Sequence, residues 1–197
     1  MTLAQHTLGV TVHNRSRAVG KLATAILVFG FALLTGFSAL WEIPLGFTPV
    51  PISGQTFAVL LAGASLGLRA GAASQILYLA MGALGLPFYS GGESGWTVLT
   101  GPTVGYLIGF AVAAAVVGHM AESKADRKIH TAVPAFMVGT LVIYLCGMVG
   151  LIAVAGMNPT QAFTLGVVPF LAGDAIKAIA AGLLLPAAWK LVETMPR

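Results

Sequence analysis

The stretch from Gln161 to Trp189 reads QAFTLGVVPFLAGDAIKAIAAGLLLPAAW, an apolar run interrupted by Asp174 and Lys177. A run of this length predicts a membrane-spanning helix, because about 20 apolar residues cross the hydrocarbon core. Residues three apart share one helix face, so the two charges can pair. Near the bilayer centre each charge costs about 2.5–3.5 kcal/mol. A buried ion pair is often no better than an apolar replacement, so this pair indicates a function in a ligand site, an ion path or a switch more than a purely structural role.

The composition of the whole chain supports a membrane protein. Of 197 residues, 57% are hydrophobic and 8% are charged, whereas soluble domains carry about 25% charged residues. We therefore predict one integral membrane domain over 1–197, with residues 1–17 as an N-terminal cytoplasmic tail. The one cysteine, Cys146, excludes an internal disulfide.

Six apolar segments are long enough to span a bilayer, for which about 17–25 residues suffice. They are Lys21–Leu40, Ile52–Leu68, Ala70–Leu86, Thr103–Ala121, Ala132–Gly156 and Gln161–Trp189. This pattern predicts an all-α membrane protein with six transmembrane helices.

The orientation of these segments follows from the basic residues. With both termini in the cytoplasm, the three outer connections contain no Lys or Arg, and nine of the ten basic residues fall inside. The exception is Lys177. We predict a multi-pass protein of the cell membrane with cytoplasmic N- and C-termini.

Two outer connections, Trp41–Pro51 and Pro87–Pro102, are rich in proline, glycine and aromatic residues. They fit an interfacial aromatic belt and equally a mobile lid over a pocket that opens outward. Small residues at four-residue spacing, Gly63, Gly67 and Gly71, allow close helix packing within the chain or with a partner, so a homo-oligomer is allowed. For Gln75, Thr140 and Tyr144 we expect interhelical hydrogen bonds.

Motifs for catalysis are missing from the sequence. It has no phosphate-binding loop and no His-Glu-x-x-His motif, and its histidines lie in the tail or near the inner face. We expect no enzyme activity, no cofactor, no metal and no nucleic-acid partner. Uphill transport by this chain would need a partner or an ion gradient.

Several motifs resemble those of the BioY family, the biotin-capturing S components of energy-coupling factor transporters. They are PVPISGQTFAVLLAG at 49–63, YLAMGALGLP at 78–87, GG at 91–92, GPTVGY at 101–106 and GDAIK at 173–177. The resemblance implies an S-component bundle that takes up biotin from outside. It also implies a membrane coupling component and two cytoplasmic ATPases as partners.

By position, the resemblance points to a biotin site at Asp174 and Lys177. It adds further candidates from the second span and the outer connections: Gln55, Gly91, Gly92, Glu93, Tyr89, Trp41 and Trp96.

Charge balance favours a ligand with its ureido ring deep at the ion pair. Asp174 can accept the ureido N–H bonds, and Lys177 can donate to the ureido oxygen or hold Asp174 ionised. The carboxylate would then sit near the outer mouth, where loop N–H groups, Gln55, Tyr89 or water would meet it. Aromatic residues of the outer connections, Trp41 and Trp96 among them, would cover the thiophane ring and the chain.

Two other functions also fit the sequence. One is an ion-coupled secondary carrier for a small organic acid, in which Asp174 binds H⁺ or Na⁺ and Lys177 releases it. The other is a membrane scaffold protein in which the ion pair is structural.

Overall fold

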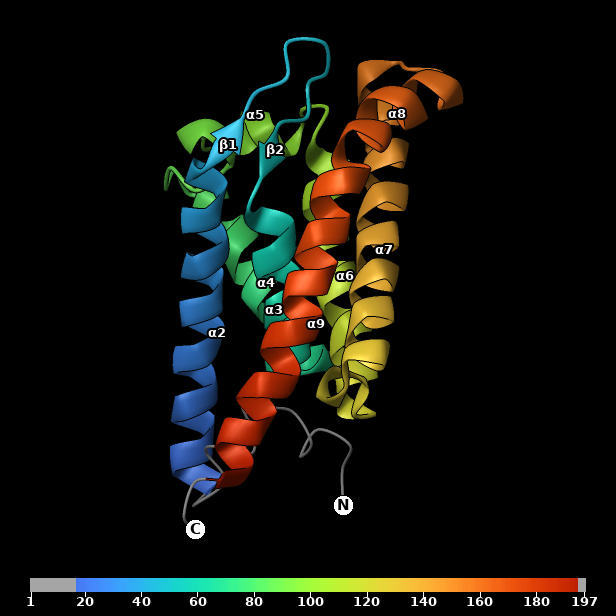
Figure 1. Cartoon of the computed structure of the whole chain (residues 1–197). Coiled ribbons are helices and arrows are strands. Elements are labelled where there is room, and N and C mark those ends of the chain that lie inside the picture. The colour runs from blue at the N-terminus through green and yellow to red at the C-terminus, as the bar shows by residue number, and fades with distance from the viewer. Residues whose placement is uncertain (1–16, 195–197) are drawn as a thin grey trace.

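The structure, a computed structural model, describes residues 17–194; the predicted tail at 1–17 therefore lies almost wholly outside it. The chain is mainly helical, and its long helices run side by side along one direction (Figure 1). The helices are α2 (Arg17–Leu40), α3 (Gln55–Leu66), α4 (Leu68–Ala83), α5 (Trp96–Leu99), α6 (Val104–Glu122), α7 (Ile129–Ala155), α8 (Pro159–Gly166) and α9 (Leu171–Thr194). Short 3₁₀ turns are η2 (Ser90–Gly92), η3 (Ala125–Arg127) and η4 (Val168–Phe170), and a two-stranded hairpin pairs β1 (Glu42–Ile43) with β2 (Ile52–Ser53).

Within residues 17–194, four helical stretches are long and apolar enough to cross a membrane: Gly20–Leu40, Val104–Glu122, Ile129–Ala155 and Pro159–Lys190. α3 has 12 residues and α4 has 16. At about 18 and 24 Å, these two helices are shorter than a hydrocarbon core of about 30 Å. The second predicted span is short because Ile52 and Ser53 form a strand and the helix begins only at Gln55. Six crossings therefore remain a prediction.

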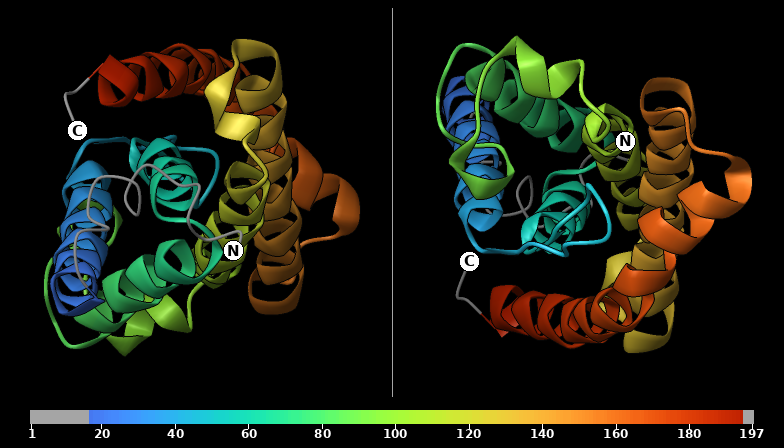
Figure 2. Two further views of the ribbon diagram at one scale, coloured as in Figure 1. Left: turned by 90° about the horizontal axis from the view of Figure 1, so that it is seen from below. Right: turned by 90° about the horizontal axis from the view of Figure 1, so that it is seen from above.

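α3 lies inside the ring formed by the other long helices (Figure 2) and contacts each of them. Glycines make the close approaches possible. A Cβ added to Gly63 of α3 would lie 2.4 Å from the backbone oxygen of Ala114 in α6, and a Cβ on Gly71 of α4 would lie 2.8 Å from Gly63 Cα. The small residues predicted to allow close packing thus pack within this chain.

The predicted span Gln161–Trp189 lies within the last of these four stretches, but it is not one regular helix. An Asn158–Gln161 capping box starts α8, which ends at Gly166, and α9 begins at Leu171. The physical reason is Pro169 in η4: proline lacks the N–H that a continuing helix needs, and it disfavours helical geometry at the residue before it. Asp174 therefore lies in the first turn of α9 instead of the middle of a long helix.

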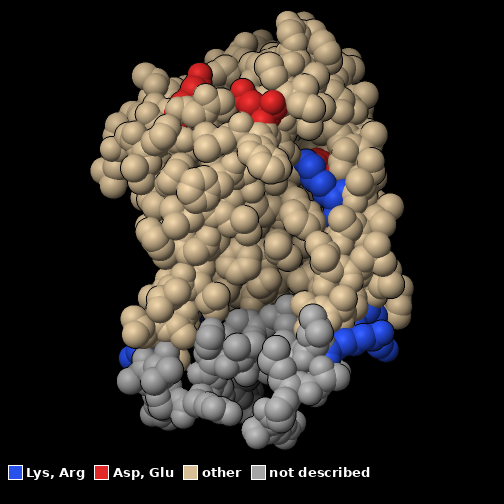
Figure 3. Space-filling view, turned by 60° about the vertical axis from the view of Figure 1, so that its left-hand side comes forward, with Lys and Arg blue, Asp and Glu red and all other residues tan. Residues whose placement is uncertain are grey.

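The two ends of the bundle differ in charge. The start of α2, the α3–α4 turn, the α6–α7 connection and the end of α9 lie at one end, and the hairpin, η2 and α8 lie at the other (Figure 1). Figure 3 shows basic side chains near the first end and acidic side chains near the second. Between the two ends, one basic side chain lies beside an acidic one in a hollow of this face.

Candidate ligand-binding site

A cavity of about 250 Å³ opens at the hairpin end of the bundle. Its wall comes from the hairpin and its connecting loop, the start of α3, the residues around η2 and α5, the halves of α6 and α7 nearer the hairpin, η4 and the start of α9. The hairpin loop is fixed over the cavity because Thr48 donates a hydrogen bond to the carbonyl of Leu165 at the end of α8 (2.9 Å). A helix end has free carbonyls that need such donors.

Asp174 lies on the cavity wall, is 6% exposed, and has three side-chain partners. One carboxylate oxygen pairs with Lys177 at 2.8 Å and accepts from Thr56 at 3.1 Å; the other accepts from the Tyr144 hydroxyl at 2.5 Å. The first turn of a helix favours a negative charge, because its N–H groups point toward it. A carboxylate has about four acceptor positions, so about one stays open for a ligand.

Lys177 uses all three of its N–H donors inside the protein. They go to Asp174 (2.8 Å), to the Thr56 hydroxyl (2.8 Å) and to the backbone oxygen of Ser53 in β2 (2.9 Å). Lys177 therefore ties α9 to β2 and to the start of α3, the helix that lies inside the bundle. To donate to a ligand it must give up one of these bonds.

Gln55 and Tyr89, predicted to bind ligand, both lie on the cavity wall with their polar groups largely engaged. Gln55 donates to the Tyr78 hydroxyl (2.6 Å) and accepts from Ser53 (2.9 Å). The Tyr89 hydroxyl donates to the carbonyl of Leu79 (2.7 Å). Burial raises the pKa of Tyr89, which keeps this donor protonated.

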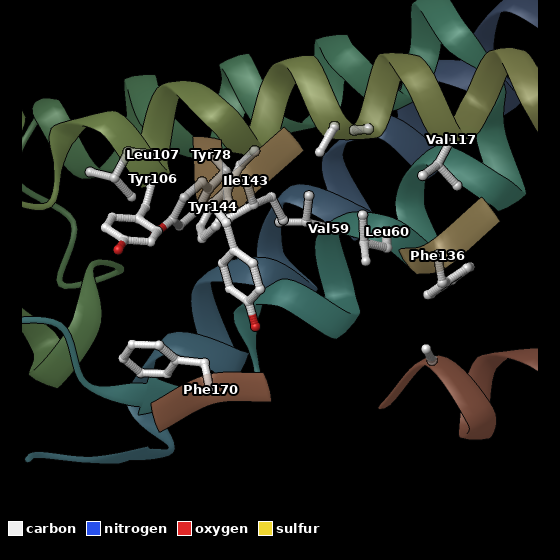
Figure 4. Packing of buried hydrophobic residues seen from close by; sticks show 14 of the residues in the cluster. Val59, Leu60, Tyr78, Tyr106, Leu107, Val117, Phe136, Ile143, Tyr144 and Phe170 are labelled. Atoms are coloured by element: carbon white, nitrogen blue, oxygen red, sulfur yellow. The ribbon is translucent and has the colours of Figure 1, made fainter. Parts of the chain in front are cut away.

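The remainder of the wall is aromatic and aliphatic. The rings of Tyr106, Tyr144 and Phe170 surround the same space (Figure 4), and Phe110 and Ile143 also line the cavity. Tyr106 is held in place by a hydrogen bond to the carbonyl of Gly166 (2.7 Å). Its neighbour Gly147 makes room for the ring, because a Cβ there would lie 2.3 Å from it. This wall suits an apolar ring and chain.

The structure gathers some of the predicted site residues and separates others. Asp174, Lys177, Gln55, Tyr89 and Glu93 line the cavity. The other predicted residues are outside its lining: Gly91 and Gly92 lie in η2, and Trp41 and Trp96 are 85% and 70% exposed.

Sequence reasoning missed several wall residues that the structure reveals. Thr56 and Ser53 carried no signal beyond their place in a motif, and Tyr144 was predicted only as an interhelical hydrogen bond, which it also makes. Glu42 could have been found as one of two acids in the outer connections.

Among residues 17–194 no group of three or more metal-ligating side chains occurs. The site thus combines an ion pair between a buried Asp174 and a partly buried Lys177, bonded hydroxyls and an apolar wall, and the fold is a membrane-type helical bundle. Together they define a helical membrane protein that holds a small-molecule cavity at one end.

Comparison with known proteins narrows this class. The model of the BioY family matches residues 10–194. The chain is 37% identical over 160 residues to the biotin transporter BioY of Rhizobium etli, covering 78% of this chain and 85% of the relative. It is 35% identical over 176 residues to the biotin transporter BioY of Rhodobacter capsulatus, covering 84% and 88%. The chain belongs to the BioY family.

A solved structure shares the fold. The S-component for biotin from an ECF-type ABC transporter superposes with a TM-score of 0.79 at 25% identity, covering 86% of this chain and 92% of that one. The predicted family is therefore confirmed.

Proposed function

We propose that this chain captures biotin from the extracytoplasmic side as the S component of an energy-coupling factor transporter. The observation that carries the proposal is the Asp174–Lys177 pair, with Asp174 buried, on the wall of a cavity of about 250 Å³ in a chain of the BioY family. The relatives' names as biotin transporters supply the ligand. The similarity to an S-component supports a coupling component and two ATPases as partners.

The proposed topology has six crossings with both termini inside. Its support is that the basic residues of 17–194 other than Lys177 belong to segments at one end of the bundle: Arg17, Lys21, Arg69, Lys124, Arg127, Lys128 and Lys190. The cavity lies at the opposite end, so under the positive-inside rule it opens outward. α3 and α4 cross as a short helical hairpin that the hairpin β1–β2 caps.

In the proposed complex the ureido ring lies against Asp174. The open acceptor position of Asp174 takes one ureido N–H, and a second needs Thr56 or Tyr144 to release its bond. Because all the donors of Lys177 are used, its role is to hold the carboxylate charged and in place. The thiophane ring and the chain lie along Tyr106, Phe110 and Phe170.

The test is a titration of biotin into the purified full chain in detergent, followed by tryptophan fluorescence. Trp41 and Trp96 are exposed at the outer end and would report loop movement. We expect saturable binding of biotin, retained binding of desthiobiotin, which keeps the ureido ring, and no binding of pentanoic acid, which lacks it. Binding of pentanoic acid as tight as that of biotin would refute the proposed site.

A further inference from the structure

The outer mouth of the cavity carries negative charge and no free positive charge. Glu42 and Glu93 both line the cavity together with the Asp174–Lys177 pair. The three outer connections, 41–54, 84–103 and 156–170, contain no Lys, Arg or His. With Lys177 compensating Asp174, the two glutamates leave the cavity with a net negative charge when they are ionised.

The position of Glu42 is fixed by its strand and by a contact with η2. It sits in β1 opposite Ser53 of β2. One of its carboxylate oxygens lies against η2, 2.8 Å from where a Cβ on Gly91 would be. The other oxygen is buried and has no hydrogen-bond partner among the described residues. Such an acceptor gains from any donor brought to it, because a buried polar group without a partner is costly.

Four donors at this end that could receive a ligand carboxylate are already bonded within the protein. The N–H groups of Gly92 and Glu93 are bonded to the backbone oxygens of Tyr89 and Ser90 at 3.0 and 3.4 Å. The Tyr89 hydroxyl and the Gln55 amide are bonded as described above. Thr103, whose hydroxyl is neutral, also lies on the wall.

We propose that Glu42 and Glu93 make this cavity select ureido-ring ligands whose chain ends in a hydrogen-bond donor, an amide or an amine, over ligands that end in a free carboxylate. This inference rests on the proposed function, since the ring must occupy the Asp174 end for the chain to reach the mouth. An ammonium group supplies both donors and the opposite charge. A carboxylate supplies acceptors and the same charge, and like charges in one site repel. The ligand class is thus biotin joined to an amine through its carboxyl group.

Three ligands with the same ring and valeryl chain test the inference: biotin, biotinamide and aminopentyl biotinamide, which end in a negative group, a neutral group and, beyond a pentyl linker, a positive group. Each is titrated into the purified full chain in a non-ionic detergent at low salt. We expect the amine to bind at least about tenfold tighter than the acid, with the amide between them. Added salt should reduce the difference, because part of the mouth is exposed.

Variants connect the preference to the glutamates. Glu42→Gln with Glu93→Gln should bring the dissociation constants of the three ligands to within about threefold, mainly by strengthening the binding of biotin. The matched control is Glu122→Gln, which removes the same charge at the other end of the bundle, where Glu122 accepts from the backbone of Leu68. That variant should keep the wild-type order of affinities.

The outcomes separate this inference from the proposed function. Tighter binding of biotin than of the amine in the wild type, or an unchanged preference in the double variant, overturns the inference and leaves biotin capture intact. If none of the three ligands binds, the ring does not occupy the cavity and both fail.

Discussion

Replacing Asp174 with Asn tests the centre of the site, because it removes a charge and keeps the shape. The carboxylate accepts from Lys177, Thr56 and Tyr144 at 2.8, 3.1 and 2.5 Å, and the ligand would add a further N–H. A hydrogen bond to a charged group contributes about 1.5–3 kcal/mol. Its loss should therefore raise the dissociation constant of biotin about 10- to 150-fold. The uncompensated charge of Lys177 would increase the loss.

The assay is a biotin titration of the purified variant, with circular dichroism to establish that it remains folded. Tyr144→Phe is the matched control, because it removes one donor to the same carboxylate and leaves the ion pair in place. Its dissociation constant should change less than about tenfold. A folded Asp174→Asn protein that binds biotin within about threefold of wild type, a difference below 1 kcal/mol, would remove Asp174 from the site.

Three further predictions concern stability, measured as the melting temperature in detergent. Gly105→Ala should destabilise the bundle by about 1–3 kcal/mol, because the new Cβ would lie 2.2 Å from the carbonyl oxygen of Cys146 in α7. The control is Gly30→Ala, which should have little effect because a Cβ there meets nothing within 4 Å. Trp189→Phe should cost about 1–3 kcal/mol, because it leaves the buried Asp126 without its indole donor and gives Arg127, now 4.1 Å from the indole centroid, a smaller ring to cover. Asp126→Asn keeps an acceptor for the indole and should cost less. Burial raises the pKa of Asp126 above its ordinary value of 3.8, so the folded protein binds this proton more tightly than the unfolded chain. The contribution of Asp126 to stability should therefore fall as pH rises from its ordinary pKa of 3.8 through its raised pKa in the folded protein. Asp126→Asn should lack this decrease of melting temperature with pH, and an equal decrease in both proteins would contradict the role given to Asp126.

The helical organisation could be predicted from the sequence, because hydropathy and punctuation act locally. Proline and glycine at residues 44–54 and 156–159 marked connections that the structure contains. The break at Pro169 was missed because the residues around it are as apolar as a helix core. Hydropathy measures the free energy of transferring a side chain into lipid, so it carries no information about the backbone N–H that proline lacks. The length of α3 was overestimated for a related reason, since Ile52 satisfies its backbone in a hairpin that only tertiary structure provides.

The site could be predicted only in part from the sequence. Asp174 and Lys177 were found because charges in an apolar run are costly wherever they lie. Their partners were not, because Thr56 and Tyr144 are ordinary residues of membrane helices until the fold brings three helices together. Trp41 and Trp96 were expected to cover a ligand, yet both are mostly exposed. Aromatic composition places a residue near an interface and does not say which way its ring points.

The hydrogen bonds of Asp174 and Lys177 indicate that a ligand in the cavity would have to replace some of the bonds that these side chains already make within the protein. Asp174 has about one acceptor position open, and Lys177 has no donor to spare. A ligand therefore gains only the difference between its own hydrogen bonds and those it displaces. The same bonding also holds α9 against β2 and α3 before the ligand arrives, so little ordering remains to be done on binding. In the proposed complex, Lys177 contributes most to ligand affinity by keeping its present hydrogen bonds. Each bond that it gave to a ligand would loosen the Asp174 carboxylate to which the ligand binds.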